Sequence, residues 1–312
     1  DGLCSKIYNI KNNKSQCLSE NSFYNSLAMV YGYASYLCGF KKNHHAGKTT
    51  GLSAHGKSKN TYNILKKYII WNNKTGVYEN KKTVFTSSLK NLTKDLSKFF
   101  KRDIAAGIQK LTDNIILDQV KFYLEKTNAK NICLVGGLHA NVLTNMRIAD
   151  KFPNKKIFVF PAMHDGGLAT GAAYLEIKKD NKKFNFDLKN YYLGNEFTDK
   201  EILNFLEKNK INFTKPKKLS KTVASLLVKN KIISRFVGKM EYGPRALGNR
   251  SILYNAKDKR TNKWLNKKLN RTDTMPFAPV ILNEYKSSYI EKYNKNNFNS
   301  FQNMTMCCHS TD

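Results

Sequence analysis

Two apolar segments, each followed by a glycine-rich turn and then by a helical pattern, restrict most strongly what this chain can fold into. Residues 132–135 are apolar and run directly into Gly136 and Gly137, and a helix is expected from about Asn141 onward. The same order of elements then returns, with a strand at 157–160, a loop at 161–167 and a helix at 168–178. Strands that alternate with helices in this way are typical of an α/β domain.

A change in composition then divides the chain. Residues 179–190 are rich in lysine and asparagine and are interpreted as a linker. Beyond it, Thr198 and Ser220 are expected to cap two helices, and residues 232–237 are expected to form a strand. We therefore predict a second, smaller α+β unit after the first domain. The predicted domains are 1–190 and 191–312.

Basic residues greatly outnumber acidic ones. The 312-residue chain has 54 Lys+Arg against 23 Asp+Glu, and its formal net charge is +31. Such a charge attracts polyanions at low salt. The lysines are nevertheless spread along the whole chain, often beside asparagine, and do not form a concentrated basic block with interleaved aromatic residues. Nucleic-acid binding is therefore disfavoured, and it remains the alternative from a different functional class.

Cysteine and hydropathy patterns favour a reducing compartment. The six cysteines show no C-x-x-C spacing that would indicate a zinc site or a disulfide framework. No apolar segment approaches the roughly 18 residues of a membrane span, and no charged-then-apolar leader precedes Asp1. We expect a cytoplasmic protein with no membrane partner. Because the first residue is not methionine, we also expect a chain that is processed or is part of a longer one.

The densest group of functional side-chain types lies at 237–253, which reads V-G-K-M-E-Y-G-P-R-A-L-G-N-R-S-I-L and follows the strand predicted at 232–237. Its glycines allow the backbone to approach a ligand or to adopt positive φ, and Pro244 fixes a bend. Arg245 and Arg250 supply planar guanidinium groups that suit phosphate or carboxylate. For either arginine alone, a surface turn with a solvated side chain is the competing interpretation.

Three other segments contain candidate ligand-binding residues. Gly136 and Gly137 could present backbone N–H groups to an anion, or could simply allow a tight turn. Asp165 begins a predicted helix in the segment P-A-M-H-D-G-G-L-A-T-G-A-A at 161–173, where its carboxylate could bind a metal ion near phosphates or cap the helix. Lys48 lies between two glycines and is a candidate anion contact, although its segment does not match a P-loop.

Five short segments gain meaning from their combination and their order. They are G-L-S-A-H-G at 51–56, G-G-L-H-A-N at 136–141, P-A-M-H-D-G-G-L-A-T-G-A-A at 161–173, E-Y-G-P-R-A-L-G-N-R-S-I-L at 241–253 and M-P-F-A-P at 275–279. Together they resemble the O-carbamoyltransferase family, which includes nodulation-factor and antibiotic-tailoring enzymes. The fourth segment is highly specific, and the matches extend over nearly the whole chain.

The resemblance implies an actin/sugar-kinase-like first domain, similar to tRNA threonylcarbamoyl-transferase subunits, and a second domain similar to threonylcarbamoyl-adenylate synthases. Family enzymes use carbamoyl phosphate and ATP to make a carbamoyl-adenylate, and then pass the carbamoyl group to a hydroxyl of a small-molecule acceptor. The implied cofactors are ATP and a divalent metal ion of iron or magnesium type. Carbamoyl phosphate and a hydroxylated acceptor are the implied partners, and a homodimer is left open.

The resemblance also implies roles for individual residues. Arg245 and Arg250 would neutralise phosphate charge during adenylation, and Asp165 matches the family's metal-binding aspartate. Contacts to nucleotide or carbamoyl phosphate are expected from Lys48, Gly136, Gly137, Asn141, Glu241, Ser251, Asn266 and Arg271. The family's other metal ligands, two histidines one helical turn apart, have no counterpart in this sequence, and His164 stands where glycine is usual. An actin-like ATPase or kinase is the remaining enzymatic alternative.

Overall fold

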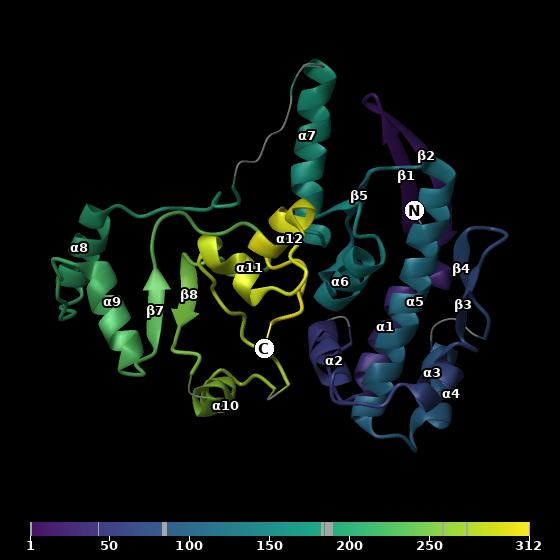
Figure 1. The fold of residues 1–312 in the computed structure, drawn as a ribbon, viewed down its shortest axis with the longest axis horizontal. Coiled ribbons are helices and arrows are strands. Elements are labelled where there is room, and N and C mark those ends of the chain that lie inside the picture. Colours follow the sequence, from purple (N-terminus) through teal and green to yellow (C-terminus); the bar gives the residue numbers. More distant parts are fainter. Residues whose placement is uncertain are drawn as a thin grey trace.

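The structure, a computed structural model, describes residues 2–42, 44–82, 86–181, 184, 190–257, 259–272 and 274–311. Within these residues the fold is mixed α/β (Figure 1). The strands are β1 (Leu3–Lys11), β2 (Lys14–Ser22), β3 (Ile69–Asn72), β4 (Val77–Asn80), β5 (Asn131–Leu134), β6 (Lys156–Val159), β7 (Ile233–Phe236) and β8 (Arg250–Leu253). The α-helices are α1 (Leu27–Leu37), α2 (Ala46–Ser53), α3 (Lys59–Leu65), α4 (Thr86–Leu96), α5 (Lys101–Thr127), α6 (Val142–Lys151), α7 (Leu168–Asp180), α8 (Asp199–Lys208), α9 (Leu219–Val228), α10 (Lys259–Lys268), α11 (Lys286–Tyr289) and α12 (Phe298–Gln302).

The long helix α5 organises the first half of the chain. It packs against α1, α2, α3 and α6, and it runs through the middle of this half in Figure 1. Ile104, Ile108, Leu111 and Ile115 are buried on it, so the apolar residues that recur at helical spacing in the sequence do face the core. The core therefore forms around one helix that several shorter helices cover.

The predicted strand, turn, helix and strand unit is confirmed. β5 and β6 pair in parallel, with Asn131 opposite Lys156, and each strand begins one residue earlier than predicted. α6 connects them, and Asn141 caps this helix by accepting a hydrogen bond from the backbone N–H of Thr144 at 3.2 Å. The turns that follow the two parallel strands therefore lie at the same edge of the sheet.

The second half contains the antiparallel pair β7 and β8, with α9 beside β7 and α8 on the far side of α9 (Figure 1). Thr198 caps α8 and forms a complete capping box with Glu201, as predicted. The prediction for Ser220 is wrong, because α9 already begins at Leu219 and Lys218 occupies the N-cap position. A serine inside the first turn has helical backbone angles, so its hydroxyl cannot replace the N-cap acceptor.

The C-terminal segment returns to the first half of the chain. Asn297 Oδ1 accepts a hydrogen bond from Ile157 N at 3.2 Å, and Ser300 Oγ donates to Ile157 O at 3.1 Å. Farther along, Cys307 N donates to Val142 O at 3.2 Å. β6 and the start of α6 are thus hydrogen-bonded to residues that lie far away in the sequence.

The predicted boundary between residues 190 and 191 stays a prediction. Most of the predicted linker, 182–183 and 185–189, lies outside the described residues. Tyr192, just after the predicted boundary, forms an isolated antiparallel bridge with Glu241. Residues shortly after the linker therefore pair with the loop between β7 and β8.

The packing of α5 against α3 gives a test of the fold. A Cβ at Gly107 would collide with Thr61 Oγ1 and lie 2.9 Å from Tyr62 N. Gly107→Ala is therefore expected to lower the free energy of unfolding by about 1–3 kcal/mol, despite the better helix propensity of alanine. Gly171→Ala in α7 is the matched control, because no described atom lies within 4 Å of its Cβ position.

The control substitution should raise the free energy of unfolding by about 0.5–1 kcal/mol through helix propensity alone. Chemical denaturation of both variants measures the difference. A stabilised Gly107→Ala protein would show that α3 does not pack this closely on α5.

Candidate functional site

Residues 136–140 form a turn, here named the glycine turn, directly after β5. Gly136 has φ +97°, a left-handed conformation that favours glycine. Its N–H donates to Met163 O at 2.6 Å, which ties the turn to the segment after β6. Among the described residues, no atom lies within 4 Å of a Cβ position at Gly136 or Gly137. The outer face of the turn is therefore open to the close approach of a ligand.

Asn141 ends the glycine turn, and its side chain is used inside the protein. Its Oδ1 accepts from Thr144 N, and its Nδ2 donates to Gln109 Oε1 at 2.9 Å. The Asn141 side chain therefore has a structural role, and the predicted nucleotide contact stays a prediction. Gln109, which the motifs did not identify, has one sequence signal: it lies on α5 one turn after buried Ala105, where an apolar residue is expected.

His139 is a second residue that the motifs did not identify. Its Nδ1 lies 3.0 Å from Asn145 Oδ1, and Asn145 Nδ2 donates to His139 O at 2.7 Å. Burial lowers the pKa of His139, and the bond to Asn145 opposes this shift without reversing it. The imidazole is therefore neutral near pH 7, with Nδ1–H donating to Asn145 and Nε2 as an acceptor. The one feature of the sequence that could have pointed to His139 is its position two residues after Gly137.

Glu241 holds the loop between β7 and β8 together. Its carboxylate Oε1 accepts hydrogen bonds from the backbone N–H groups of Leu247, Asn249 and Arg250 at 2.9, 2.7 and 3.0 Å. Burial by itself would raise the pKa of Glu241, but its own backbone N–H and these three N–H groups together hold the pKa below its usual value. The buried carboxylate thus shapes the loop, and contact with nucleotide or carbamoyl phosphate stays a prediction.

Arg250 and Ser251 are also engaged within this loop. The Arg250 guanidinium lies over the Phe236 ring at 3.7 Å and donates to four backbone carbonyl oxygens. These belong to Val237, Gly238, Asn249 and Asn195. Ser251 Oγ accepts from Gly248 N at 3.0 Å. In this arrangement both side chains fix the loop, and their proposed roles in substrate binding remain untested.

Arg245 differs from Arg250, because its Nε is buried and has no hydrogen-bond partner among the described residues. Burial lowers the pKa of Arg245, and the neighbouring Cys307 thiol opposes this shift. The loop that carries Arg245 lies against the segment after β6: a Cβ at Gly243 would lie 3.2 Å from the carbonyl carbon of Pro161. An unpaired, buried N–H of a guanidinium favours an anionic oxygen as its partner.

Tyr242 joins the same two segments. Its hydroxyl lies 2.6 Å from Thr170 Oγ1 and donates to Gly166 O at 3.2 Å. Asp165 therefore lies next to the Arg245 loop in the fold, and its side chain is exposed. The described residues contain no group of three or more His, Cys, Asp or Glu side chains that could hold a metal ion. Asp165 alone does not complete a metal site.

Lys48, Asn266 and Arg271 lie on two segments of the chain that pack against each other. A Cβ at Gly51 in α2 would lie 2.7 Å from Thr274 O, so the helix that carries Lys48 packs on the segment after α10. Asn266 Nδ2 donates to Met275 O at 3.2 Å, whereas its buried Oδ1 has no partner among the described residues. The Arg271 guanidinium stacks on Phe277 at 4.3 Å. An open depression of about 420 Å³ is lined by Lys263, Lys267, Asn270 and Arg271.

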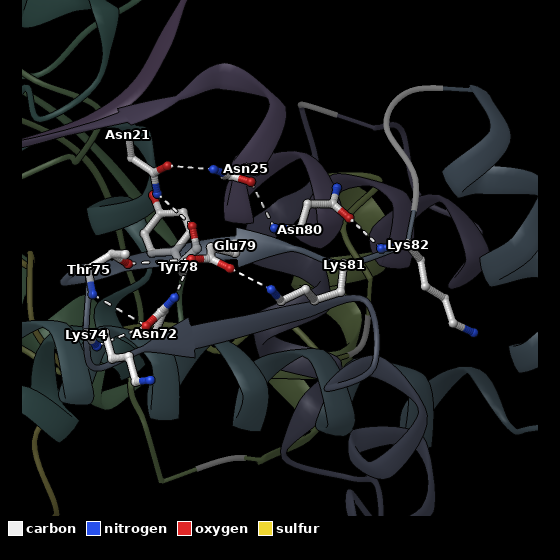
Figure 2. Close-up of polar contacts among 10 residues, drawn as sticks. All are labelled: Asn21, Asn25, Asn72, Lys74, Thr75, Tyr78, Glu79, Asn80, Lys81 and Lys82. Atoms are coloured by element: carbon white, nitrogen blue, oxygen red, sulfur yellow. Dashed lines mark hydrogen bonds and ion pairs between the residues drawn. The ribbon is translucent and has the colours of Figure 1, made fainter.

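A third polar cluster surrounds Glu79 on β4 and has a structural role (Figure 2). Lys81 Nζ donates to Glu79 Oε2 at 2.6 Å, and Asn72 Nδ2 donates to the other carboxylate oxygen. The bond from Lys81 is the largest cause that lowers the pKa of Glu79. Because Asn72 and Glu79 lie on paired strands, the cluster closes the β3–β4 hairpin.

The sequence also matches known families. Residues 3–174 match the family described as carbamoyltransferase N-terminus, and residues 224–311 match the one described as carbamoyltransferase C-terminus. The first match alone covers more than half of the chain. This chain therefore belongs to the carbamoyltransferase family.

Several relatives are similar to this chain over much of its length. An uncharacterized protein of Methanocaldococcus jannaschii is 32% identical over 303 residues, which cover 93% of this chain and 57% of the relative. A second one from the same organism is 31% identical over 278 residues, covering 86% and 46%. The nodulation protein NolO of Bradyrhizobium diazoefficiens is 29% identical over 196 residues, covering 61% and 36%. The chain spans about half the length of the first two relatives.

In the part of the chain that the structure describes, no helix combines the length and the apolar character that crossing a membrane requires.

The role of Glu241 in the loop can be measured by its pH dependence. Because its folded-state pKa lies below the usual value, the carboxylate stabilises the fold at neutral pH, and this stabilisation is lost as the pH falls through the folded-state value. Glu241→Gln is expected to lower the free energy of unfolding by about 1–3 kcal/mol at pH 7, and by less in acid.

Denaturant unfolding at several pH values measures both effects. Glu207→Gln, at an exposed position of α8, is the matched control and should change stability by less than about 0.5 kcal/mol. Equal effects of the two substitutions at pH 7 would contradict the assigned role of the Glu241 carboxylate.

Proposed function

We propose that this chain carries the nucleotide- and carbamoyl-handling parts of an enzyme that uses carbamoyl phosphate and ATP. The enzyme forms carbamoyl-adenylate and transfers the carbamoyl group to a hydroxyl of a small-molecule acceptor. Membership of the carbamoyltransferase family supports the transferase class. The proposal includes an actin/sugar-kinase-like first domain, a second domain similar to threonylcarbamoyl-adenylate synthases, and a cytoplasmic location.

The observation that carries the proposal is the placement of Arg245. Its Nε is buried without a partner in the described part of the chain, and its loop touches Pro161 and is joined to Thr170 by Tyr242. The same segment after β6 is tied to the open glycine turn through Met163. The Arg245 guanidinium and the accessible glycine backbone therefore lie on two loops that contact the same segment. Both groups are suited to binding phosphate oxygens.

The reaction balances in two steps. In the first step water cleaves carbamoyl phosphate into carbamate and inorganic phosphate. A carbamate oxygen then bonds to the α-phosphorus of ATP while the α–β phosphoric anhydride bond breaks, which gives carbamoyl-adenylate and pyrophosphate. In the second step the acceptor oxygen bonds to the carbamoyl carbon, the bond from that carbon to the adenylate oxygen breaks, and AMP leaves as the hydroxyl loses its proton. Arg245 would stabilise the negative charge on phosphate oxygens in the first step.

The other candidate residues fall into supporting roles in this proposal. Glu241, Arg250 and Ser251 hold the shape of the loop that presents Arg245. Gly136 and Gly137 would lie against nucleotide phosphates, and Lys48, Asn266 and Arg271 would form further contacts across the α2 interface. Asp165 would supply a single oxygen ligand, and no step is assigned to a metal ion.

Pyrophosphate release with and without carbamoyl phosphate tests the proposal. Both the 312-residue chain and the longest protein that contains it are assayed. We expect the longer protein to release pyrophosphate in a carbamoyl-phosphate-dependent reaction. Arg245→Ala should lower the rate of this release by about 100-fold or more, because electrostatic stabilisation of the transition state is lost. Absence of any carbamoyl-phosphate dependence in both proteins would rule the proposed reaction out.

The matched control for Arg245→Ala is Arg235→Ala on β7. Arg235 is exposed in the same half of the chain, and no hydrogen bond of its side chain is seen in the described residues. Its removal deletes the same charge and should leave pyrophosphate release nearly unchanged. If both variants lose activity equally, net charge rather than the placement of Arg245 is responsible.

The open face of the glycine turn gives a second test. Gly137 has room for a Cβ, so Gly137→Ala should leave the free energy of unfolding unchanged within about 0.5 kcal/mol. If ATP phosphates approach this backbone, the added methyl group will nevertheless weaken ATP binding by about tenfold or more. Titration calorimetry with ATP measures the affinity, and an unchanged affinity would place the nucleotide elsewhere.

A further inference from the structure

A buried polar network under the glycine turn connects it to α2. At its centre is Gln109 on α5, which is 4% exposed. Gln109 Oε1 accepts from Tyr31 Oη and from Asn141 Nδ2, at 2.9 Å in each case. Gln109 Nε2 donates to Asp113 Oδ1 at 2.8 Å and to Thr144 Oγ1 at 3.1 Å. Both ends of a single amide are therefore fully used.

The network extends to α2 through Tyr31. Its hydroxyl lies 2.8 Å from Thr50 Oγ1, and Thr50 lies two residues after Lys48 on α2. At the other end, Asn141 caps α6 and completes the glycine turn. Lys48 lies 88 residues or more before the glycine turn in the sequence, and the helix that carries it is thus linked to this turn by a short chain of buried and half-buried hydrogen bonds.

We propose that Gln109 is a positioning residue that holds the glycine turn and α2 in fixed register, so that the affinity for nucleotide depends on it although it does not touch the ligand. The nucleotide part of this proposal rests on the proposed function, in which the chain binds ATP. Gln109 suits the task because an amide both donates and accepts, whereas a carboxylate at this position would face the carboxylate of Asp113.

The surrounding geometry supports positioning over simple core filling. Asp113 Oδ1 accepts from Gln109 and from Thr144 Oγ1 at 2.7 Å, so the helix that carries Gln109 is bonded directly to α6 as well. Thr144 is fully buried, and Tyr31 is 5% exposed. Water therefore has little access to the bonds from Gln109 to Tyr31 and Thr144, and breaking either of them would loosen the contacts that fix the turn.

Two substitutions with matched controls test the proposal. Tyr31→Phe removes only the hydroxyl that joins α2 to Gln109, and Gln109→Met removes the amide while keeping its length. The control for the first is Tyr123→Phe, which also loses one buried hydroxyl bond, to Gly76 O at 2.8 Å. The control for the second is Gln119→Met, at another buried position of α5.

The first readout is backbone hydrogen exchange, which requires no ligand. Tyr31→Phe and Gln109→Met should speed exchange in residues 46–53 and 136–145 together, by about fivefold and about tenfold, as expected for the loss of one or more buried hydrogen bonds. Tyr123→Phe and Gln119→Met should leave these two segments unchanged. If exchange in the two segments does not rise in the test variants, the coupling is refuted.

The second readout is ATP affinity, measured by calorimetry on the same proteins. Tyr31→Phe should weaken ATP binding by about fivefold, and Gln109→Met should weaken it by about tenfold or more. Tyr123→Phe and Gln119→Met should bind ATP with wild-type affinity. Unchanged affinity in the test variants, in a protein that binds ATP, overturns the positioning role. If the wild-type protein itself does not bind ATP, the proposed function fails and the nucleotide role of Gln109 fails with it, whereas the exchange data still decide whether the segments are coupled.

Discussion

The burial of α5 is the constraint on which the rest of this structure depends. Four helices, α1, α2, α3 and α6, pack on α5. The loops at the ends of these four helices are therefore held in place relative to α5. Burying the polar Gln109 and Asp113 on such a helix has a desolvation cost, which is offset because both side chains are hydrogen-bonded. One helix therefore contributes the apolar core and also the polar support under the glycine turn.

The second half of the chain is held in a different way. Among its described residues between 190 and 290, only Glu241, Leu265 and Asn266 are buried. Contacts between charged side chains and the backbone take a larger part here: the Glu241 carboxylate binds N–H groups, and the Arg250 guanidinium binds carbonyl oxygens. Because these contacts fix the loop, Arg245 can keep an N–H that is unpaired within the described residues at the boundary with the first half.

Local elements could be predicted from the sequence to within a residue or two. The parallel strands, the cap at Asn141 and the capping box at Thr198 follow from apolar segments, glycines and cap residues in the right order. Ser220 was misplaced because a helix start shifts by one residue at little cost when no side chain caps it. Gln109 was missed because its partner Asn141 lies 32 residues away in the sequence. His139 was missed because its role depends on burial and on a side-chain contact with Asn145, which residue type and spacing do not specify.

The sequence by itself determined the family, the α/β character of the first half and the identity of the segments that carry the candidate site, because these depend on residue type and local order. Only the tertiary structure decided that the Arg250 guanidinium is hydrogen-bonded to the backbone whereas Arg245 Nε has no partner among the described residues. It also decided that α2 packs against Thr274 and that the C-terminal segment hydrogen-bonds to β6. The reason is physical: burial and hydrogen-bond satisfaction are properties of the packed chain, and the spacing of residues along a sequence does not specify which groups meet.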